Sequence, residues 1–203
     1  MNNGKVKWTI KVNGTPQKFE GECYPPNDSK RRYVLKVYPK DKIQTKKEIF
    51  VIMLNPSTAD ENEPDQTCKF LINQCNWNGH NSITICNLFS SRGLIEKLNE
   101  CMENDTANDN SSDEKLKEQI KKFDEILCAW GGPYKGIKNK KVLNDRIKEV
   151  FKILESQKLR GKKILKLKKD SENRCSQYPP HPLGKAHHTE FEPYCIEEIN
   201  IEG

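Results

Sequence analysis

The chain has 203 residues, of which 34% are hydrophobic and 32% charged, and its formal net charge is +6. It has no apolar run long enough to cross a bilayer, and its alternating start, MNNGKVKWTIKV, is unlike the apolar block of a signal peptide. We therefore expect a cytoplasmic protein with no membrane partner, folded as one domain over residues 1–203.

The first segment, residues 1–48, has the pattern of antiparallel strands. Residues 5–12 alternate between polar and apolar side chains, and Asn13-Gly14 follows with the chemistry of a hairpin turn. Residues 18–23 and 32–38 continue as strand-like runs. We expect these strands to form a small antiparallel hairpin appendage beside the main sheet.

Residues 49–190 alternate between short apolar runs and helical patterns, and residues 191–203 are an acidic tail. The expected buried strands are 50–54, 83–88, 125–130 and 163–167. The expected helices are 65–76, 94–102, 114–123 and 139–156, the third capped by Ser112 or Asp113 after a polar loop over 104–113. This alternation predicts an α/β fold, a three-layer sandwich around a four-stranded parallel sheet.

A functional side chain follows each predicted parallel strand. Asn55, Asn87 and Trp130 end the first three apolar runs, and His181 follows the fourth after a loop. Because ligands bind at the carboxyl ends of strands in open α/β sheets, these residues are candidates for one pocket. Each also has a structural interpretation: a strand-exit turn at Asn55, a core position for Trp130 and an exposed loop for His181.

Four motifs carry a resemblance to a known family. They are Met53-Leu54-Asn55-Pro56, Ile85-Cys86-Asn87, Ala129-Trp130-Gly131 and His181-Pro182-Leu183-Gly184. Their order and chemistry resemble the uracil-DNA glycosylase superfamily, whose proteins act in DNA repair. The stretch NPSTAD, followed by Asp65 and Thr67, also resembles a bacterial family known only as a domain of unknown function. The glycosylase resemblance implies the strand order 2-1-3-4.

The resemblance implies roles for individual side chains. Asn55 would position water, Asn87 would recognise the polar edge of an extruded base, and His181 would donate a hydrogen bond to the leaving base. Asp65 is either the general base of a different reaction or the cap of the helix that follows it. Ser57 and Phe70 complete the expected substrate-binding residues.

The departures from the glycosylase pattern matter equally. Asn55 is neutral where the most active branch has an aspartate. In that superfamily an aromatic ring about a dozen residues past the first motif stacks on the extruded base, and here Cys68 is closer to that spacing than Phe70. Lys185 occupies the place of the leucine that wedges into DNA. We therefore expect a divergent pseudoenzyme without ordinary uracil excision that binds nucleic acid, a nucleobase or a small acidic protein that mimics DNA. The alternatives are an active glycosylase or nucleosidase for a modified base, and a protein-interaction module with a vestigial pocket.

The basic residues and the cysteines indicate which partners, metals and cofactors to expect. Residues 135–169 contain 14 Lys and Arg against three acids, a net charge of +11. Such a stretch is either a phosphate-binding surface or a solvated helix face. The candidate partner-binding lysines are Lys135, Lys138, Lys140, Lys141 and Lys185. None of the eight cysteines forms a C-x-x-C pair, so we expect no metal. We also expect reduced thiols, no cofactor and a monomer.

Overall fold

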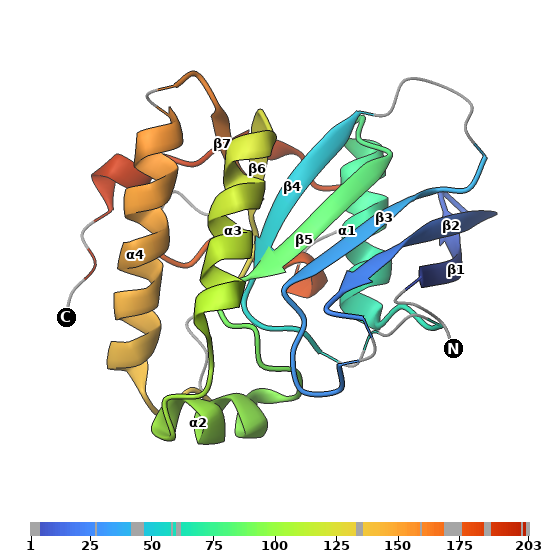
Figure 1. The fold of residues 1–203 in the computed structure, drawn as a ribbon. Helices are drawn as coiled ribbons and strands as arrows, with labels where there is room; N and C mark the ends of the chain where they lie inside the picture. The colour runs from blue at the N-terminus through green and yellow to red at the C-terminus, as the bar shows by residue number, and fades with distance from the viewer. Residues whose placement is uncertain are drawn as a thin grey trace.

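The computed structural model describes residues 5–26, 28–41, 47–57, 59, 62–132, 136–158, 160–168, 176–184, 188–199 and 201. One mixed sheet holds the eight described strands in the order β1-β2-β3-β5-β4-β6-β7-β8 (Figure 1). The strands are β1 Lys5–Val12, β2 Thr15–Tyr24, β3 Val34–Pro39, β4 Glu48–Met53, β5 Ser82–Asn87, β6 Glu125–Cys128, β7 Lys163–Leu167 and β8 Phe191–Pro193. The helices are α1 Gln66–Trp77, α2 Ile95–Glu103, α3 Asn110–Lys122 and α4 Lys140–Lys158, with the 3-10 turns η1 Pro182–Gly184 and η2 Ile196–Glu198.

The predicted four-stranded parallel sheet with a separate hairpin is wrong. The strands β5, β4, β6 and β7 are parallel to one another, but β3 pairs with β5 in antiparallel register through Leu35 and Ile85. At the other edge β8 pairs antiparallel with β7. Unpaired edge strands expose backbone donors and acceptors, so both edges of the parallel strands are covered by the segments predicted to be an appendage and a tail. The sheet is therefore continuous from the first strand to the last.

The two faces of the sheet carry different helices. In β4, Ile49, Val51 and Met53 belong to the core under α1, while Phe50 and Ile52 belong to the core under α2, α3 and α4. Figure 1 shows α1 behind the sheet and α3 and α4 in front of it, with α2 below. Successive strand residues point to opposite faces, so a central strand covered on both faces reads as a continuous apolar run.

The hairpin β1–β2 extends the α1 face. Burial alternates along β1, where Val6, Trp8, Ile10 and Val12 point into the core that also contains α1. Its turn is at Asn13 and Gly14, which have φ values of 50° and 81°. That left-handed conformation suits these two residue types and matches the twist of a two-residue hairpin. The turn predicted there is confirmed.

Two local predictions need correction. Helix α3 begins at Asn110 rather than 114, because Asp109 accepts a hydrogen bond from the backbone N–H of Ser112 at 2.8 Å and forms a capping box with it. The loop predicted over 104–113 therefore ends early. The acidic tail contains β8 and the fully buried Tyr194, whose hydroxyl donates to the Ser176 carbonyl at 2.6 Å. Within the described ranges, no helix is long and apolar enough to cross a membrane.

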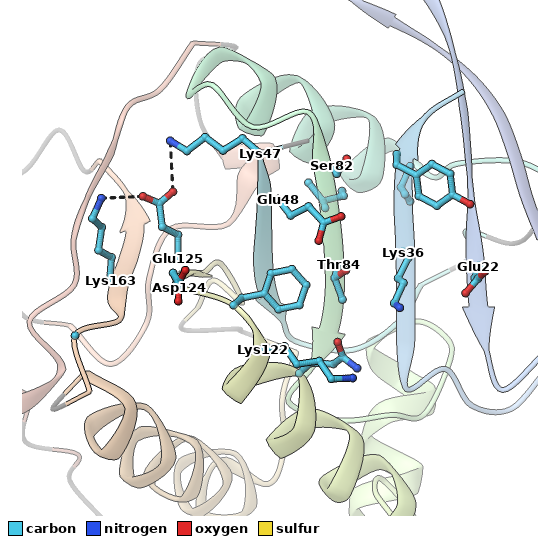
Figure 2. A pocket seen from close by; sticks show the side chains of 16 residues that line it. Glu22, Lys36, Lys47, Glu48, Ser82, Thr84, Lys122, Asp124, Glu125 and Lys163 are labelled. Carbon is cyan, nitrogen blue, oxygen red and sulfur yellow. Dashed lines mark hydrogen bonds and ion pairs between the residues drawn. The ribbon is translucent and has the colours of Figure 1, made fainter. Parts of the chain in front are cut away.

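Glu125 joins the amino ends of the four parallel strands. Its carboxylate lies 2.5 Å from Nε2 of His80, which precedes β5, 3.6 Å from Nζ of Lys47, which precedes β4, and 2.9 Å from Nζ of Lys163 in β7. Figure 2 shows Lys47 and Lys163 reaching Glu125 from opposite sides. Burial alone would raise the pKa of Glu125, but the hydrogen bonds from Lys163 and His80 and the nearby charges lower it to about 2.

We expect Glu125→Gln to destabilise the protein by about 1–2 kcal/mol at pH 7, because the partly buried ion pairs with Lys47 and Lys163 lose their negative partner. Since the folded pKa lies below the ordinary value of 4.5, the carboxylate stabilises the fold above that pH, and this contribution disappears as the pH falls from about 4.5 towards about 2. The variant should therefore lose the acid-dependent part of the unfolding curve in that window, measured by urea denaturation at several pH values.

The matched control is Glu118→Gln. The hydrogen bonds from Lys115 and Lys122 also lower the pKa of Glu118 to about 2, but this carboxylate is on the exposed face of α3. Solvent screens such pairs, so stability at pH 7 should change little. Equal effects at the two positions would show that the strand ends do not depend on Glu125.

Candidate functional site

A small cavity lies at the carboxyl ends of β4 and β5, on the face of the sheet that carries α1. Its volume is about 180 Å³. Met53 and Ile85 point to the α1 core, and Asn87 follows Ile85 by two residues within β5, so its side chain is on the same side of the sheet. Strand alternation therefore aims Asn87 towards the cavity, whereas Asn55 reaches the lining from the bend that follows β4.

Two further segments close the cavity. The amino-terminal turns of α1 contribute Asp65, Thr67, Cys68 and Leu71, and η1, which packs against α1, is preceded by His181. The remaining lining residues are Arg32, Leu54, Ser57, Gly93, Leu94 and Ile95. The cavity thus gathers segments from residue 32 to residue 181.

Asn87 is the most informative side chain of the site. It is the last residue of β5, it is only 7% exposed, and its Nδ2 has no hydrogen-bond partner in the described structure. A buried amide donor without a partner costs about 1–3 kcal/mol. Because the side chain lines a cavity, a ligand is the natural acceptor for this donor.

His181 has a defined tautomer in its neutral form. The backbone N–H of Leu183 donates to Nδ1 at 3.2 Å, so the proton of the neutral ring is on Nε2. Burial lowers the pKa of His181, and the nearby charge of Asp65 opposes this shift only in part. At neutral pH the ring therefore presents an uncharged N–H donor to the cavity.

Asn55 is held in place by the loop that precedes α2. Its Nδ2 donates to the carbonyl of Gly93 at 2.8 Å and to that of Pro56 at 3.3 Å, and the N–H of Gly93 donates back to the Pro56 carbonyl at 2.9 Å. The donor end of the amide is thus committed to backbone. Its Oδ1 is the atom that can accept a hydrogen bond from a ligand or a water.

Asp65 caps α1, as one of its two predicted roles required. Its Oδ1 accepts from the N–H of Cys68 at 2.7 Å. Cys68 is buried in the cavity wall, where burial and then the charge of Asp65 raise the pKa of its thiol. The thiol is therefore protonated at neutral pH and is a poor nucleophile.

Three other residues predicted from the sequence lie in different places. Ser57 lines the cavity, whereas Phe70 is half-buried on α1 and is not part of the lining. Trp130 is fully buried, packs against Phe151 and Tyr194, and donates from Nε1 to the Gln177 carbonyl at 3.1 Å. Trp130 is therefore a core residue, which was its structural interpretation.

The predicted basic surface is described only in part. Lys135 and Lys185 lie outside the described residues. Lys138 is 4.0 Å from Glu103 and Lys141 is 2.6 Å from Asp145. Lys140 is exposed at the start of α4. Two of these lysines thus have acidic neighbours, and a nucleic-acid or acidic-protein partner for this surface stays a prediction.

Sequence reasoning missed Arg32. This arginine is 4% exposed and lines the cavity through its position before β3, which pairs antiparallel with β5. An arginine at the start of a strand-like run gives no sign of its burial. Only the pairing of β3 with β5 places it beside the carboxyl end of β5.

A second, larger hollow is at the opposite end of the parallel strands. This groove of about 760 Å³ is lined by the charged residues around Glu125 (Figure 2). Glu125 already has Lys47, His80 and Lys163 as close partners there, and none of the described buried polar atoms without a partner belongs to the lining of the groove. The carboxyl-end cavity is therefore the better candidate site. Across the described residues, no group of three His, Cys, Asp or Glu side chains is arranged to hold a metal ion.

The comparison with protein families identifies the chain at family level. Residues 32–183 match the model described as "Protein of unknown function (DUF1643)". The chain belongs to the DUF1643 family. Its predicted membership of a domain-of-unknown-function family is confirmed at that level. No curated protein and no solved structure matches the chain, and nothing in these comparisons links this DUF1643 protein to the uracil-DNA glycosylases. The matched residues contain the complete cavity lining.

We expect Asn55→Asp to destabilise the protein by about 1–3 kcal/mol, because it replaces a donor to two backbone carbonyls with an acceptor. Urea denaturation measures the loss. The control is Asn104→Asp, where the same substitution removes one bond to the Glu100 carbonyl at an exposed helix end. A variant as stable as the wild type would show that Asn55 is free to act on a ligand and does not hold the loop.

Proposed function

We propose that the cavity binds a single nucleobase or a similar base-sized heterocycle. The observation that carries this proposal is the buried Nδ2 of Asn87, which has no partner and lines the cavity. A carbonyl oxygen of a pyrimidine ring would supply the missing acceptor.

The size of the cavity supports a ligand of this class. Pockets for drug-sized molecules have volumes of about 300–1,000 Å³. The cavity has about 180 Å³, which suits one heterocyclic ring rather than a complete nucleotide. Met53, Leu71 and Ile85 provide apolar surfaces of the kind that contact ring faces, and the polar groups are few.

The hydrogen-bonding groups match the edge of a pyrimidine. An amide has both a donor and an acceptor, so Asn87 can pair with a carbonyl and the adjacent ring N–H. The neutral His181 offers a second donor from Nε2. Uracil and related rings have carbonyl, N–H and carbonyl groups in succession, which this pair of side chains complements.

The same geometry favours binding over hydrolysis of an N-glycosidic bond. Asn55 is neutral and its donor is committed to Gly93, while the Oδ1 of Asp65 accepts the capping bond of α1. Activation of water requires a base within hydrogen-bond reach, and the capping bond restricts Asp65 to its second oxygen for that purpose. Phe70, the candidate stacking ring, is not in the cavity lining, which removes about 1–3 kcal/mol per base of stacking.

We expect uracil to bind to the wild-type protein and to shift the amide NMR signals of residues around the cavity. Asn87→Asp should weaken binding about 10–100-fold, because it replaces the orphan donor with an acceptor that repels the ring carbonyl. Asn104→Asp, on an exposed helix end, is the control and should leave binding unchanged. Equal binding by wild type and Asn87→Asp would refute the proposed site.

A base-release assay tests the choice between binding and catalysis. We expect no release of uracil from single- or double-stranded DNA above the level of a His181→Ala variant, since Asn55 is neutral and Asp65 is held in the first turn of α1 by its capping bond. Efficient release that Asn87→Ala abolishes would instead establish the alternative, an active glycosylase. Including DNA with modified pyrimidines extends the assay to the nucleosidase or modified-base alternative.

A further inference from the structure

Arg32 is a buried cation in the wall of the cavity. Its side chain is 4% exposed, and its described side-chain hydrogen bond runs from Nη1 to the Ala59 carbonyl at 2.9 Å. Nε has no hydrogen-bond partner among the residues that the structure describes. A buried guanidinium normally has a carboxylate or several acceptors, because removing the charge from water is costly. One neutral carbonyl is a poor substitute for them.

Two other buried or half-buried arginines have described carboxylate partners, whereas the half-buried Arg92 donates to the Asp28 and Ala59 carbonyls. Arg146 lies 2.5 Å from Asp113 and 3.0 Å from Glu149, and Arg31 lies 3.1 Å from Asp109. Among the described residues, no carboxylate is paired with Arg32. Asp65 lines the same cavity, but its Oδ1 is engaged by the N–H of Cys68. Among the described residues, the Nε of Arg32 is therefore a buried cationic donor that a ligand in the cavity could satisfy.

The donors of the cavity converge on one kind of ligand. Arg32 Nε, Asn87 Nδ2 and His181 Nε2 are all donors, and the first two are buried with no partner in the described part of the chain. A neutral ring can satisfy the amide and the imidazole. The guanidinium has a planar fork of N–H groups, which is complementary to an oxyanion.

We propose that Arg32 is an anion-binding residue and that the ligand is a base-sized heterocycle with a single delocalised negative charge. This inference rests on the proposed function and specifies the ligand class of the same cavity. The charge can come from the deprotonated ring itself or from a carboxylate on the ring. Both present the same chemistry to Arg32, a planar oxyanion beside a ring edge.

The experiment compares three probes of similar size by calorimetry or NMR titration at neutral pH. They are uracil, which is neutral, barbiturate, whose ring is anionic, and orotate, which is a uracil with a carboxylate. We expect at least one of the anions to bind the wild type about tenfold or more tightly than uracil, as a charge-assisted hydrogen bond predicts. The anion that binds more tightly than uracil identifies the source of the charge. Equal or weaker binding of both anions would overturn the proposal.

Variants separate the anion site from its structural surroundings. Arg32→Gln should abolish the preference for the anion while uracil binding persists, and Arg32→Lys should reduce the preference, because an ammonium cannot form the planar fork. Arg92→Lys is the matched control. Arg92 also donates to the Ala59 carbonyl, at 2.7 Å, but does not line the cavity. An equal loss of preference in Arg92→Lys would show that the effect runs through the Ala59 backbone and would refute a direct role for Arg32.

The outcomes also distinguish this inference from the proposed function. If uracil binding does not depend on Asn87, the base site itself is wrong. If uracil binds through Asn87 but neither anion gains affinity, only the role of Arg32 is wrong. Thermal unfolding of each variant reports whether it is folded. If both Arg32 variants unfold, the wild-type preference between the neutral and anionic probes remains the test.

Discussion

The enclosure of β5 determines where the candidate site lies. This strand has β3 on one edge and β4 on the other, and all six of its residues are buried. Its last residue, Asn87, is therefore removed from water by the same packing that stabilises the centre of the sheet. The backbone of β5 pairs with both neighbouring strands, but the Nδ2 of Asn87 has no partner among the described residues. A polar group in such a place has a free-energy cost that a ligand can offset.

Several residues around the cavity serve the scaffold first. Asn55 ties the end of β4 to the loop before α2, and Asp65 fixes the first turn of α1. Two arginines hold the Ala59 carbonyl. These contacts restrict the walls before any ligand arrives, and a preformed site loses less entropy on binding. The residues whose motifs resemble catalytic groups therefore also have a structural role, which is to keep a small pocket open.

The sequence predicts the parts of the site that depend on local pattern. Asn55 and Asn87 follow apolar runs, so the sequence pattern predicts their place at strand ends. His181 was expected at the same end, and it reaches the cavity because η1 packs against α1. The burial of Arg32 and the pairing of β3 with β5 were not predictable, because the pattern of one strand does not specify which distant strand it pairs with. Likewise, β8 is three residues long and its pairing with β7 is set by packing around Tyr194 rather than by its acidic composition.

The arrangement of charge along the parallel strands has a consequence for how the protein can change. Glu125 and its partners Lys47, His80 and Lys163 lie at the amino ends, whereas the cavity lies at the carboxyl ends. The six residues of β4 separate these ends by roughly 20 Å, from a rise of about 3.3 Å per residue. Sites so far apart usually contribute independently to stability. Substitutions in the cavity lining should therefore leave the contribution of Glu125 to stability unchanged, even where they remove scaffold contacts of their own, as at Asn55 and Asp65.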